Sequence, residues 1–446
     1  MNPYQYIDKF ARFGRKKGYN PGHERINALL EPFSHPENKM RIIHVAGSNG
    51  KGSTVTYLKS IYKEAGYKVG TYTSPHLLEF NERIEINGRK ISTGELEELI
   101  EKIKPVVDEM KERGPGEPSF FELVTALAFI YFYQEKVDLL ILETGLGGRL
   151  DATNIIKNPL ASVITGVSLE HTNILGNSIR AIAREKAGII KEKTPVVTGI
   201  QDREALTEIE KIGIEKGSKL ISINDRYSYE LKESTLEGQS FLLKHREKGS
   251  EVNKQELIPE DEYRTRMIGD FQVRNAVLAM EVVRLLQEEL PVSGEELREG
   301  LKKAYIPGRM DLISKEPLLL VDGAHNSEGM ENLVSSLLAF KERGVIDDRS
   351  KIYIILAVLD DKDLFNMLKS LSRLEKFELI VSENSNERAL SAYEIMKKAE
   401  LLGLEGRIIK PLEEALKESV DYASKEDLIC VAGSLYNVAE VIKFLK

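Results

Sequence analysis

Residues 47–54 read Gly-Ser-Asn-Gly-Lys-Gly-Ser-Thr, a combination of glycines, a lysine and hydroxyls that can bind phosphate. The stretch departs from the standard phosphate loop, G-x-x-x-x-G-K-[ST], because its first glycine comes too late and Gly52 separates Lys51 from the next hydroxyl. Backbone N–H groups of a glycine-rich turn that opens a helix attract phosphate oxygens, and Lys51 adds positive charge. The stretch therefore predicts a nucleotide site with a hydroxyl in reach of magnesium; an ordinary glycine-rich turn is the plainer alternative.

Other polar residues follow apolar, strand-like runs or lie on a nearby helix. Glu143 ends the run VDLLILE, and His171 follows the run ASVITGV. Lys186 lies in the helical segment REKAGIIK, and both Asp322 and His325 lie in DGAHN, after the run LLLV. Open α/β sheets bind ligands at the carboxyl ends of their strands, and a carboxylate there suits magnesium. Taken singly, each residue has a plainer reading. Glu143 would belong to a strained turn, His171 would be a hydrogen-bonding loop residue, and Lys186 would be a solvated charge. Asp322 and His325 would cap a helix.

The glycine-rich segment 143–154, ETGLGGRLDATN, also follows a strand-like run. A dinucleotide fingerprint, G-x-G-x-x-G, would need its last glycine at position 150, where this chain has Leu150. Binding of a nicotinamide cofactor is therefore unsupported.

The elements that must position these residues alternate between strands and helices. We expect strands over 41–46, 67–73, 137–143 and 161–167, and helices over 52–66, 96–110, 123–133 and 271–290. Capping boxes, in which a serine is followed three residues later by a glutamate, open two of the helices at Ser92 and Ser119. The continuous apolar runs predict a mostly parallel sheet covered on both faces. We expect a long loop over 74–90 and a small antiparallel excursion within 219–265.

The second half of the chain repeats the alternation. We expect strands in LLLVDG, KIYIILAVL, FELIVS, GRIIK and DLICVAG, separated by helices near 325–342, 362–373, 387–402, 411–424 and 434–445. This pattern predicts a second open α/β sheet, similar to a Rossmann fold. The Pro-Gly pair in AYIPGRM, residues 304–310, marks the expected boundary between a nucleotide-binding domain over 1–304 and a smaller domain over 305–446.

Composition excludes several classes of protein. The net charge of −8 among 446 residues argues against a nucleic-acid-binding protein, which carries a basic surplus. The single cysteine, Cys430, excludes a disulfide framework and is expected to be a buried apolar residue. The N-terminus has no apolar signal core, and the longest apolar run, LVTALAFIYF, is far shorter than the roughly 20 residues of a membrane span. We expect a cytoplasmic protein, and a monomer, that binds neither nucleic acid nor membrane.

Together the motifs are far more specific than any of them alone. The chain resembles the folylpolyglutamate synthase and dihydrofolate synthase group of the Mur ligase superfamily. The matching motifs run in that group's order from about residue 22 to the C-terminus: GSNGKGST, YTSPHLLEFNERI, FFELVTALAF, LETGLGGRLDATN, EKAGIIK, FQVRNA, PGRM, DGAHN, LDDKD and GSLYNVAEV. The resemblance implies an ATP-dependent amide ligation, in which the terminal carboxylate of a reduced folate becomes an acyl phosphate that the amine of L-glutamate then attacks.

The resemblance also implies roles for individual residues. The residues expected to hold ATP are Gly47, Ser48, Asn49, Gly50, Lys51, Gly52, Ser53, Asn275, Arg309 and Asp322. Two magnesium ions are expected, the first bound by Ser74 and Glu143 and the second by His171, and Lys186 matches a lysine that the group carries as a carbamate. Arg83 is expected on the folate side, and His325, Ser434 and Tyr436 on the glutamate side. Arg309 lies in the interdomain linker, so we expect it to reach the phosphates only when the domains close.

Three positions depart from the group's pattern. Ser48 replaces a threonine and keeps the hydroxyl, and Glu170 replaces an aspartate with one more methylene. Phe271 replaces a histidine before the Asn275 region, which puts the detail of the adenine pocket in doubt. The sequence does not decide whether dihydropteroate is also an acceptor. From other classes, a non-catalytic ATP-binding switch and a P-loop kinase are alternatives, but the second α/β domain is hard to explain under either.

Overall fold

The computed structural model describes residues 2–10, 22–246 and 257–445. Packing divides the chain into two compact units, which are described one at a time. Unit 1 comprises residues 1–228, 245–259 and 275–301, and unit 2 comprises residues 229–244, 260–274 and 302–446. The boundary expected after residue 304 stays a prediction.

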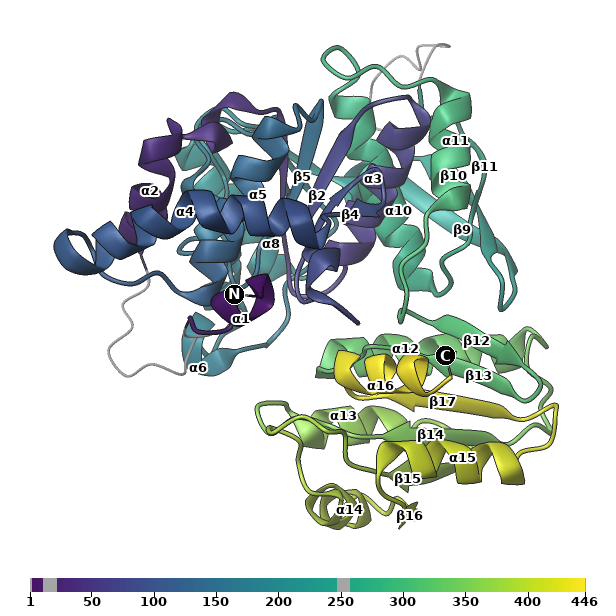
Figure 1. Ribbon diagram of the computed structural model, residues 1–446. Helices are drawn as coiled ribbons and strands as arrows, with labels where there is room; N and C mark the ends of the chain where they lie inside the picture. Colours follow the sequence, from purple (N-terminus) through teal and green to yellow (C-terminus); the bar gives the residue numbers. More distant parts are fainter. Residues whose placement is uncertain (1, 11–21, 247–256, 446) are drawn as a thin grey trace. The chain divides into compact units, whose positions relative to one another are not determined.

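Unit 1 is built on an eight-stranded sheet with the order β4-β3-β2-β5-β1-β6-β7-β8. Figure 1 labels β2, β4 and β5 of this sheet. Its strands are β1 (Ile42–Ala46), β2 (Val69–Tyr72), β3 (Ile84–Ile86), β4 (Arg89–Lys90), β5 (Leu139–Glu143), β6 (Ala161–Ile164), β7 (Val196–Thr198) and β8 (Leu220–Ser222). The strands from β2 to β8 in this order run parallel to one another, and β3 and β4 form an antiparallel edge. Every residue of β1 and β5 is buried, as the continuous apolar runs predicted for a sheet covered on both faces.

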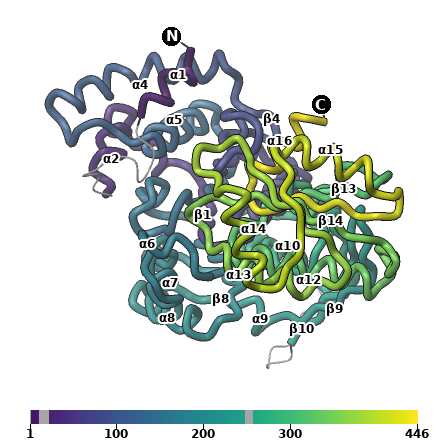
Figure 2. The backbone as a smooth tube through the Cα atoms, turned by 90° about the horizontal axis from the view of Figure 1, so that it is seen from below, coloured from purple at the N-terminus to yellow at the C-terminus, as the bar shows by residue number. Residues whose placement is uncertain are grey.

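Helices cover both faces of this sheet. The α-helices of unit 1 are α1 (Pro3–Ile7), α2 (Glu24–Leu30), α3 (Lys51–Glu64), α4 (Thr93–Arg113), α5 (Phe120–Gln134), α6 (Thr172–Leu175), α7 (Ile179–Ala187), α8 (Arg203–Glu215), α9 (Ile223–Arg226), α10 (Asp270–Leu285, shared with unit 2) and α11 (Gly294–Lys303, whose last residues fall in unit 2). Short 3-10 turns are η1 (Glu31–Phe33), η2 (Pro36–Lys39), η3 (Phe80–Arg83) and η4 (Ala152–Ile155). Helices α7 and α8 lie side by side, as Figure 2 shows.

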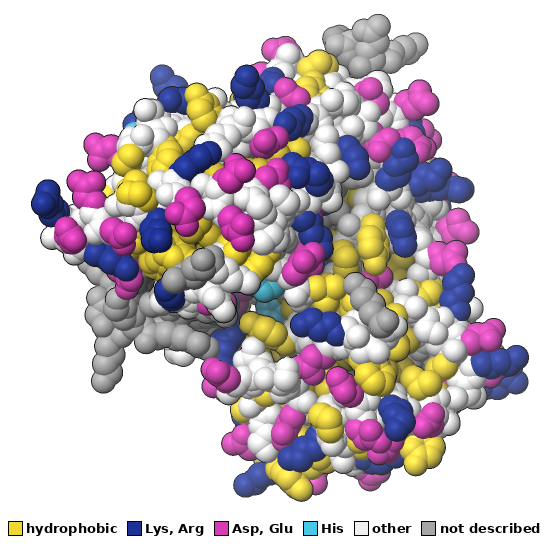
Figure 3. Space-filling view, in the orientation of Figure 1, with side chains coloured by type: hydrophobic (Ala, Val, Ile, Leu, Met, Phe, Trp, Pro, Cys, Tyr) yellow, Lys and Arg dark blue, Asp and Glu magenta, His cyan; other side chains and the backbone are white. Residues whose placement is uncertain are grey.

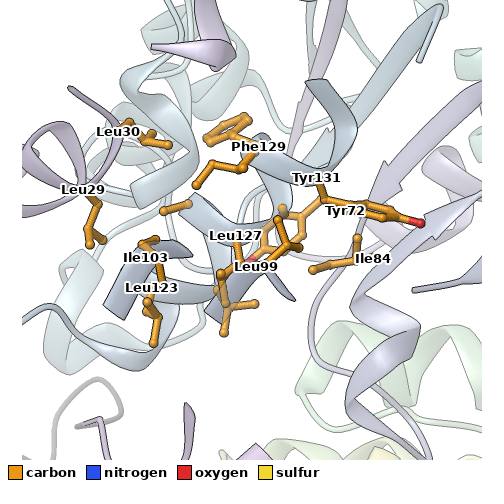
Figure 4. Packing of buried hydrophobic residues seen from close by; sticks show 14 of the residues in the cluster. Leu29, Leu30, Tyr72, Ile84, Leu99, Ile103, Leu123, Leu127, Phe129 and Tyr131 are labelled. Carbon is orange, nitrogen blue, oxygen red and sulfur yellow. The ribbon is translucent and has the colours of Figure 1, made fainter. Parts of the chain in front are cut away.

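The largest core cluster of unit 1 lies where α2, α4 and α5 pack against the sheet. Figure 4 shows Leu99 and Ile103 of α4 facing Leu123 and Leu127 of α5, with Tyr72 of β2 beside them. All residues of α5 from Glu122 to Phe132 are buried, which confirms the expectation drawn from its apolar sequence. This rigid layer supports β2 and β5, the strands that lead into Ser74 and Glu143.

Both predicted capping boxes are present, but in different surroundings. The Ser119 hydroxyl accepts the N–H of Glu122 at 3.2 Å in the protein interior, and the carboxylate of Glu122 also pairs with Arg25 at 2.9 Å. The Ser92 hydroxyl accepts the N–H of Glu95 at 3.2 Å on an exposed surface. The two boxes therefore differ mainly in solvent access. If the serine hydroxyl were removed, water could bind the freed N–H of Glu95 but not that of Glu122.

We predict that Ser119→Ala destabilises the protein more than Ser92→Ala does. The first change leaves a buried N–H without a partner, which costs about 1–3 kcal/mol. The second exposes its N–H to water, and loss of such a cap costs about 0.5–1 kcal/mol. Urea unfolding followed by circular dichroism measures both variants, and equal shifts of the two midpoints would contradict the prediction.

The polar region between β8 and α10 contains a three-stranded sheet with the order β11-β10-β9. Its strands are β9 (Tyr227–Ser234), β10 (Gln239–His245) and β11 (Asp261–Thr265). Strands β10 and β11 pair antiparallel, which confirms the expected antiparallel excursion. Residues 247–256 of that excursion lie outside the described residues.

Unit 2 contains a six-stranded sheet with the order β12-β13-β17-β14-β15-β16. Its strands are β12 (Asp311–Lys315), β13 (Leu318–Val321), β14 (Ile352–Leu356), β15 (Phe377–Val381), β16 (Gly406–Ile408) and β17 (Leu428–Ala432). Its helices are α12 (Ser327–Glu342), α13 (Leu364–Leu371), α14 (Ala392–Glu400), α15 (Leu412–Tyr422) and α16 (Leu435–Phe444). Helix α12 packs beside α13 and α15 beside α16, and the five strands from β13 to β16 run parallel, so the expected second α/β sheet is confirmed (Figure 1).

Several expected boundaries and one expected loop are wrong. Segment 74–90 is not a continuous loop, because it contains η3 and the hairpin of β3 and β4. The turn of that hairpin is Asn87-Gly88, both with positive φ, and Asn-Gly is a strong hairpin signal. Helix α3 ends at Glu64 rather than Gly66, and strand β12, which pairs antiparallel with β13, was not expected.

Two predictions from composition are settled among the described residues. Cys430 is free and buried in β17, and burial raises the pKa of its thiol. In the part of the chain that the structure describes, no helix is both long and apolar enough to cross a membrane. Basic and acidic side chains are intermixed on the face of the molecule seen in Figure 3.

Candidate active site

The predicted site residues of unit 1 follow the carboxyl ends of four neighbouring strands. Strand β1 lies between β5 and β6, and β2 lies on the other side of β5. Because these strands are parallel, the residues that follow them meet at one edge of the sheet. Gly47 follows β1, Ser74 lies just beyond β2, Glu143 ends β5, and the segment 165–171 follows β6. The strand order thus gathers residues that lie up to 124 positions apart, from Gly47 to His171.

Two glycines of the phosphate loop are required by the backbone and by close neighbours. Gly47 has a φ of +155°, and a Cβ there would collide with the hydroxyl of Thr165. Gly50 precedes α3 with a φ of +85°, and a Cβ there would lie 2.5 Å from Oδ1 of Asn275. Asn275 of α10 therefore lies against the loop.

Lys51 folds back onto the loop that precedes it. Its Nζ donates to the carbonyl oxygens of Gly47 at 2.7 Å and Ser48 at 3.1 Å. The loop itself is tied to the segment after β6, because the N–H of Ser48 donates to the carbonyl of Gly166 at 2.9 Å. The ammonium group is thus held at the first turn of α3, where backbone N–H groups attract phosphate.

Glu143 and Ser74 are brought together. The backbone N–H of Ser74 donates to Oε2 of Glu143 at 3.1 Å, and Glu143 is buried. Among the described residues, no three His, Cys, Asp or Glu side chains form a cluster that could hold a metal ion by themselves. Magnesium at a nucleotide site usually keeps several waters and binds one or two carboxylates plus substrate phosphates, so this donor set fits magnesium.

Lys186 has an ion-pair partner that the sequence did not reveal. Its side chain is only 1% exposed, and its Nζ lies 2.6 Å from Oε1 of Glu170. Burial raises the pKa of Glu170, but the ammonium groups of Lys186 and Lys51 outweigh that effect and lower the pKa to about 2. Glu170 was noted only as a longer replacement of an aspartate; here it links Lys186 electrostatically to the phosphate loop.

His171 lies directly before α6, in a left-handed conformation with a φ of 45°. Such backbone geometry is uncommon for a residue other than glycine and often marks a functional segment. The structure thus places His171 at the same edge of the sheet as the phosphate loop. Its assignment as a metal ligand stays a prediction.

The segment after Glu143 is held by two residues that the sequence analysis did not select. Oδ2 of Asp151 accepts the N–H groups of Gly145 at 3.0 Å and Leu146 at 2.9 Å. Nδ2 of Asn154 donates to the carbonyls of Arg149 at 3.1 Å and Gly188 at 2.9 Å, next to the end of α7. Asp151 therefore fixes the turn beyond Glu143, and Asn154 ties the same segment to the helix of Lys186. Their signal in sequence was the DATN run that closes a glycine-rich turn.

Arg83 lies beside an aromatic cavity. Its Nε donates to Nδ1 of His76 at 2.9 Å, and its guanidinium lies 5.5 Å from the centre of the Phe120 ring. His76 and Phe120 also line a cavity of about 320 Å³, together with Tyr4, Ile7, Asp8, Glu79, Phe80 and Asn81. Aromatic walls with a few polar groups are typical of sites for flat organic ligands.

In unit 2, the side chain of Asp322 holds the backbone next to two other predicted residues, Arg309 and His325. Its Oδ2 accepts the N–H of Met310 and its Oδ1 accepts the N–H of Ala324, both at 2.7 Å. Burial raises the pKa of Asp322, although the charge of Arg309 and the two N–H groups oppose that shift. The structure thus places Arg309 and Asp322 near each other.

The three residues expected on the glutamate side follow β13 and β17. Ser434 caps α16, since its hydroxyl accepts the N–H of Tyr436 at 3.1 Å, and Tyr436 is 42% exposed. Nδ1 of His325 lies 2.8 Å from the carbonyl of Gly323, so Nδ1 carries the donated proton. Asn437, which the sequence analysis missed, donates to the carbonyls at the ends of β14 and β17 at 2.7 Å each.

Two family models match the chain. Residues 45–283 match the Mur ligase middle domain, and residues 308–435 match the Mur ligase glutamate ligase domain. The first match alone spans more than half of the chain and contains the phosphate loop, Glu143, His171 and Lys186.

Two curated relatives match this chain over almost their whole length. The chain is 38% identical to dihydrofolate synthase/folylpolyglutamate synthase of Bacillus subtilis, with 99% of both chains covered. It is 31% identical to folylpolyglutamate synthase of Lacticaseibacillus casei, covering 98% of this chain and 96% of that protein.

Solved structures agree with these matches. Folylpolyglutamate synthase of Thermotoga maritima gives a TM-score of 0.80 at 32% identity. The match covers 99% of this chain and 95% of the Thermotoga maritima chain. Folylpolyglutamate synthase of Mycobacterium tuberculosis complexed with ADP gives a TM-score of 0.85 at 26% identity and covers 99% and 97% of the two chains.

Proposed function

Because this chain belongs to the Mur ligase family of dihydrofolate and folylpolyglutamate synthases, an ATP-dependent ligase family, we propose that it joins L-glutamate to the terminal carboxylate of a reduced folate. The observation that carries the proposal is the 38% identity to the Bacillus subtilis enzyme over 99% of both chains. The strand-end arrangement around the phosphate loop supports the same chemistry.

The reaction needs no nucleophile from the protein. A carboxylate oxygen of the folate attacks the γ-phosphorus of ATP, ADP leaves, and an acyl phosphate forms. The amine of glutamate then attacks the acyl carbon, inorganic phosphate leaves, and the amine gives up a proton as the amide forms. Catalysis of such a sequence rests on positioning and on neutralising charge. We assign Lys51 and the N–H groups of residues 47–53 to the phosphates, with Asn275 beside them.

The proposed metal ligands in unit 1 fit a hard cation. Ser74 and Glu143 would hold one magnesium ion and His171 a second. When bound, magnesium would neutralise the charge of the phosphate oxygens. Glu143 and the backbone of Ser74 are already oriented toward each other by their hydrogen bond.

We also infer that Lys186 is carbamylated in the working enzyme. Carbon dioxide adds to the neutral amine, and one proton is released. The ion pair with Glu170 must open in that step, because the new carbamate and the Glu170 carboxylate are both anions. The burial of Lys186 keeps the amine away from water and so favours retention of the adduct.

Carbamylation of Lys186 has a direct spectroscopic consequence. We predict that protein equilibrated with ¹³C-bicarbonate shows one ¹³C carbamate resonance that Lys186→Arg protein lacks. Arginine keeps a positive charge opposite Glu170 but cannot form this adduct, so it is the matched control. A resonance of equal intensity in both proteins would contradict the assignment.

The acceptor is proposed to place its flat ring system in the cavity beside Phe80 and Phe120. Arg83 and His76 would then face the polar part of that substrate. In unit 2, Arg309 and Asp322 remain the predicted nucleotide contacts, and His325, Ser434 and Tyr436 the predicted glutamate contacts. Some relatives are named folylpolyglutamate synthase and others carry the name dihydrofolate synthase as well, so two acceptors are proposed for this chain: a reduced folate and dihydropteroate.

Mass spectrometry of the reaction products tests substrate and reaction together. Purified protein is incubated with ATP, Mg²⁺ and L-glutamate, and either tetrahydrofolate or dihydropteroate is supplied as acceptor. The proposal expects an added glutamyl residue and ADP release that needs both acceptor and glutamate. A switch would bind ATP without this turnover, and a kinase would give a phosphorylated product without glutamate. Absence of any glutamyl product with reduced folates would refute the proposed function.

A further inference from the structure

We propose that His44 is a positioning residue, which acts through Thr153 and Asp151 to fix the turn that follows Glu143. His44 lies in the middle of β1, two residues before the end of the strand that leads into the phosphate loop. The role of Glu143 rests on the proposed function, whereas the protonation state argued for His44 does not.

Three side chains form a buried chain of hydrogen bonds. Nε2 of His44 lies 2.8 Å from Oγ1 of Thr153, and Oγ1 of Thr153 lies 2.6 Å from Oδ1 of Asp151. His44 and Thr153 are both fully buried. Asp151 in turn holds the N–H groups of Gly145 and Leu146 through its other oxygen. These hydrogen bonds therefore link β1, the strand that leads into the phosphate loop, to the turn beyond Glu143.

The distances fix where the protons are. Two oxygens 2.6 Å apart need a proton between them, and the carboxylate of Asp151 already accepts three backbone N–H groups, from Gly145, Leu146 and Thr153. The hydroxyl proton of Thr153 is therefore donated to Asp151. Because a hydroxyl has a single proton to give, Thr153 can only accept from His44. Nε2 of His44 must then carry a proton.

The reverse arrangement would need a protonated Asp151. Burial raises the pKa of Asp151, and the hydrogen bonds that it accepts oppose that shift. With a protonated Asp151, Thr153 would donate to His44, and the histidine proton would move to Nδ1. Nδ1 has no hydrogen-bond partner among the described residues, so that tautomer would bury an unpaired N–H. Nδ1 is unpaired in either form, so the choice between them rests on Asp151: its four accepted hydrogen bonds, three of them from backbone N–H groups, favour the charged carboxylate and hence the Nε2–H form of His44.

The surroundings also keep His44 uncharged. Burial, with a smaller contribution from the charge of Lys191, lowers the pKa of His44 to about 3. A neutral ring at physiological pH can donate one hydrogen bond, and Thr153 receives it. The hydroxyl of Thr153, itself held by His44, then helps to orient the carboxylate of Asp151. Groups that hydrogen-bond directly to metal ligands typically change metal affinity 10–100-fold when removed, and because Thr153 acts through Asp151 we expect the lower end of that range.

Nitrogen-15 NMR of histidine-labelled protein tests the tautomer directly. The chain has seven histidines, and the His44 signals are assigned by their absence from His44→Gln protein. We expect Nε2 of His44 to be the protonated nitrogen and Nδ1 to be the unprotonated one. The opposite pattern, or a doubly protonated ring at neutral pH, would overturn the proposal. This outcome is independent of whether the protein proves to be a glutamate ligase.

Matched substitutions of Thr153 test the link to Glu143. Thr153→Val keeps the shape of the side chain but removes the hydroxyl, and Thr153→Ser keeps the hydroxyl. Calorimetry measures Mg²⁺ binding in the presence of the non-hydrolysable ATP analogue AMPPCP. We expect Mg²⁺ affinity to fall about tenfold in Thr153→Val and to stay within about twofold of wild type in Thr153→Ser.

The thermal unfolding midpoint of each variant separates positioning from loss of structure. The proposal is overturned when Thr153→Val binds Mg²⁺ as wild type does, or when Thr153→Ser is as weak as Thr153→Val. Should Thr153→Val prove unstable, the histidine spectrum of the wild-type protein still decides the tautomer. Loss of ligation with normal histidine signals would count against the proposed function alone.

Discussion

Replacement of Lys51 by alanine is expected to lower the rate of glutamate-dependent ADP release by at least about 100-fold. The ammonium group is held at the first turn of α3, where it can neutralise the phosphoryl group that is transferred. Removal of one preorganised donor to a developing charge costs about 10²–10³ in kcat. Steady-state assays with saturating reduced folate and glutamate measure the effect, and the expected change lies mainly in kcat.

Lys63→Ala is the matched control for Lys51→Ala. Lys63 lies on the same helix, α3, but its side chain is exposed near the helix end. Its loss is expected to leave kcat within about twofold of wild type, because isolated surface charges contribute little. Full activity of Lys51→Ala, or equal losses in both variants, would remove Lys51 from the proposed chemistry.

The sequence predicted that several candidate residues lie at one edge of the sheet because these residues follow recognisable elements. Apolar runs of strand length ended at Ala46 and Glu143, and the rule that parallel strands share a carboxyl edge then brought these residues together. The same reasoning worked for the helices that open with Ser92 and Ser119, because a capping box is a local signal. A local signal of this kind can be read directly from the sequence, because the groups that form the interaction are only three residues apart.

The missed elements had weaker local signals. The hairpin of β3 and β4 has only three and two residues in its strands, so its alternation is too short to stand out, although Asn87-Gly88 marked the turn. Strand β12 reaches β13 through a turn with Glu316-Pro317, and a proline near a run argues against strand.

The details of the site lay beyond the sequence for a different reason. The pairing of Lys186 with Glu170 joins helix α7 to the loop after β6. Likewise, the link from His44 to Thr153 joins residues 109 positions apart. Long-range contacts between polar groups have no periodic pattern in sequence, so only the folded structure shows them. The residues that hold the predicted ligands in place, such as Asp151 and Thr153, were therefore missed, while the ligand roles themselves stay predictions.

Substitution of Glu143 by glutamine is expected to weaken Mg²⁺ binding and to lower the ligation rate by about 100-fold or more. Glutamine has nearly the same size, and its amide oxygen can still accept the N–H of Ser74. The change therefore removes the negative charge while the local hydrogen bond can persist. A neutral amide is a weaker partner than a carboxylate for a divalent cation, and the transferred phosphoryl group then loses part of its neutralisation.

The dependence on Mg²⁺ separates a metal ligand from a structural residue in the Glu143→Gln experiment. The Mg²⁺ concentration that gives half-maximal activity should rise, and excess Mg²⁺ should recover part of the rate. Glu135→Gln, which alters a carboxylate on the surface at the end of α5, is the matched control and should keep the wild-type Mg²⁺ dependence. An unchanged Mg²⁺ dependence in Glu143→Gln with a normal thermal midpoint would show that Glu143 does not bind the metal. Glu143 would then be a structural residue that accepts the N–H of Ser74, and the first metal site would have to be sought among other oxygens at this edge of the sheet.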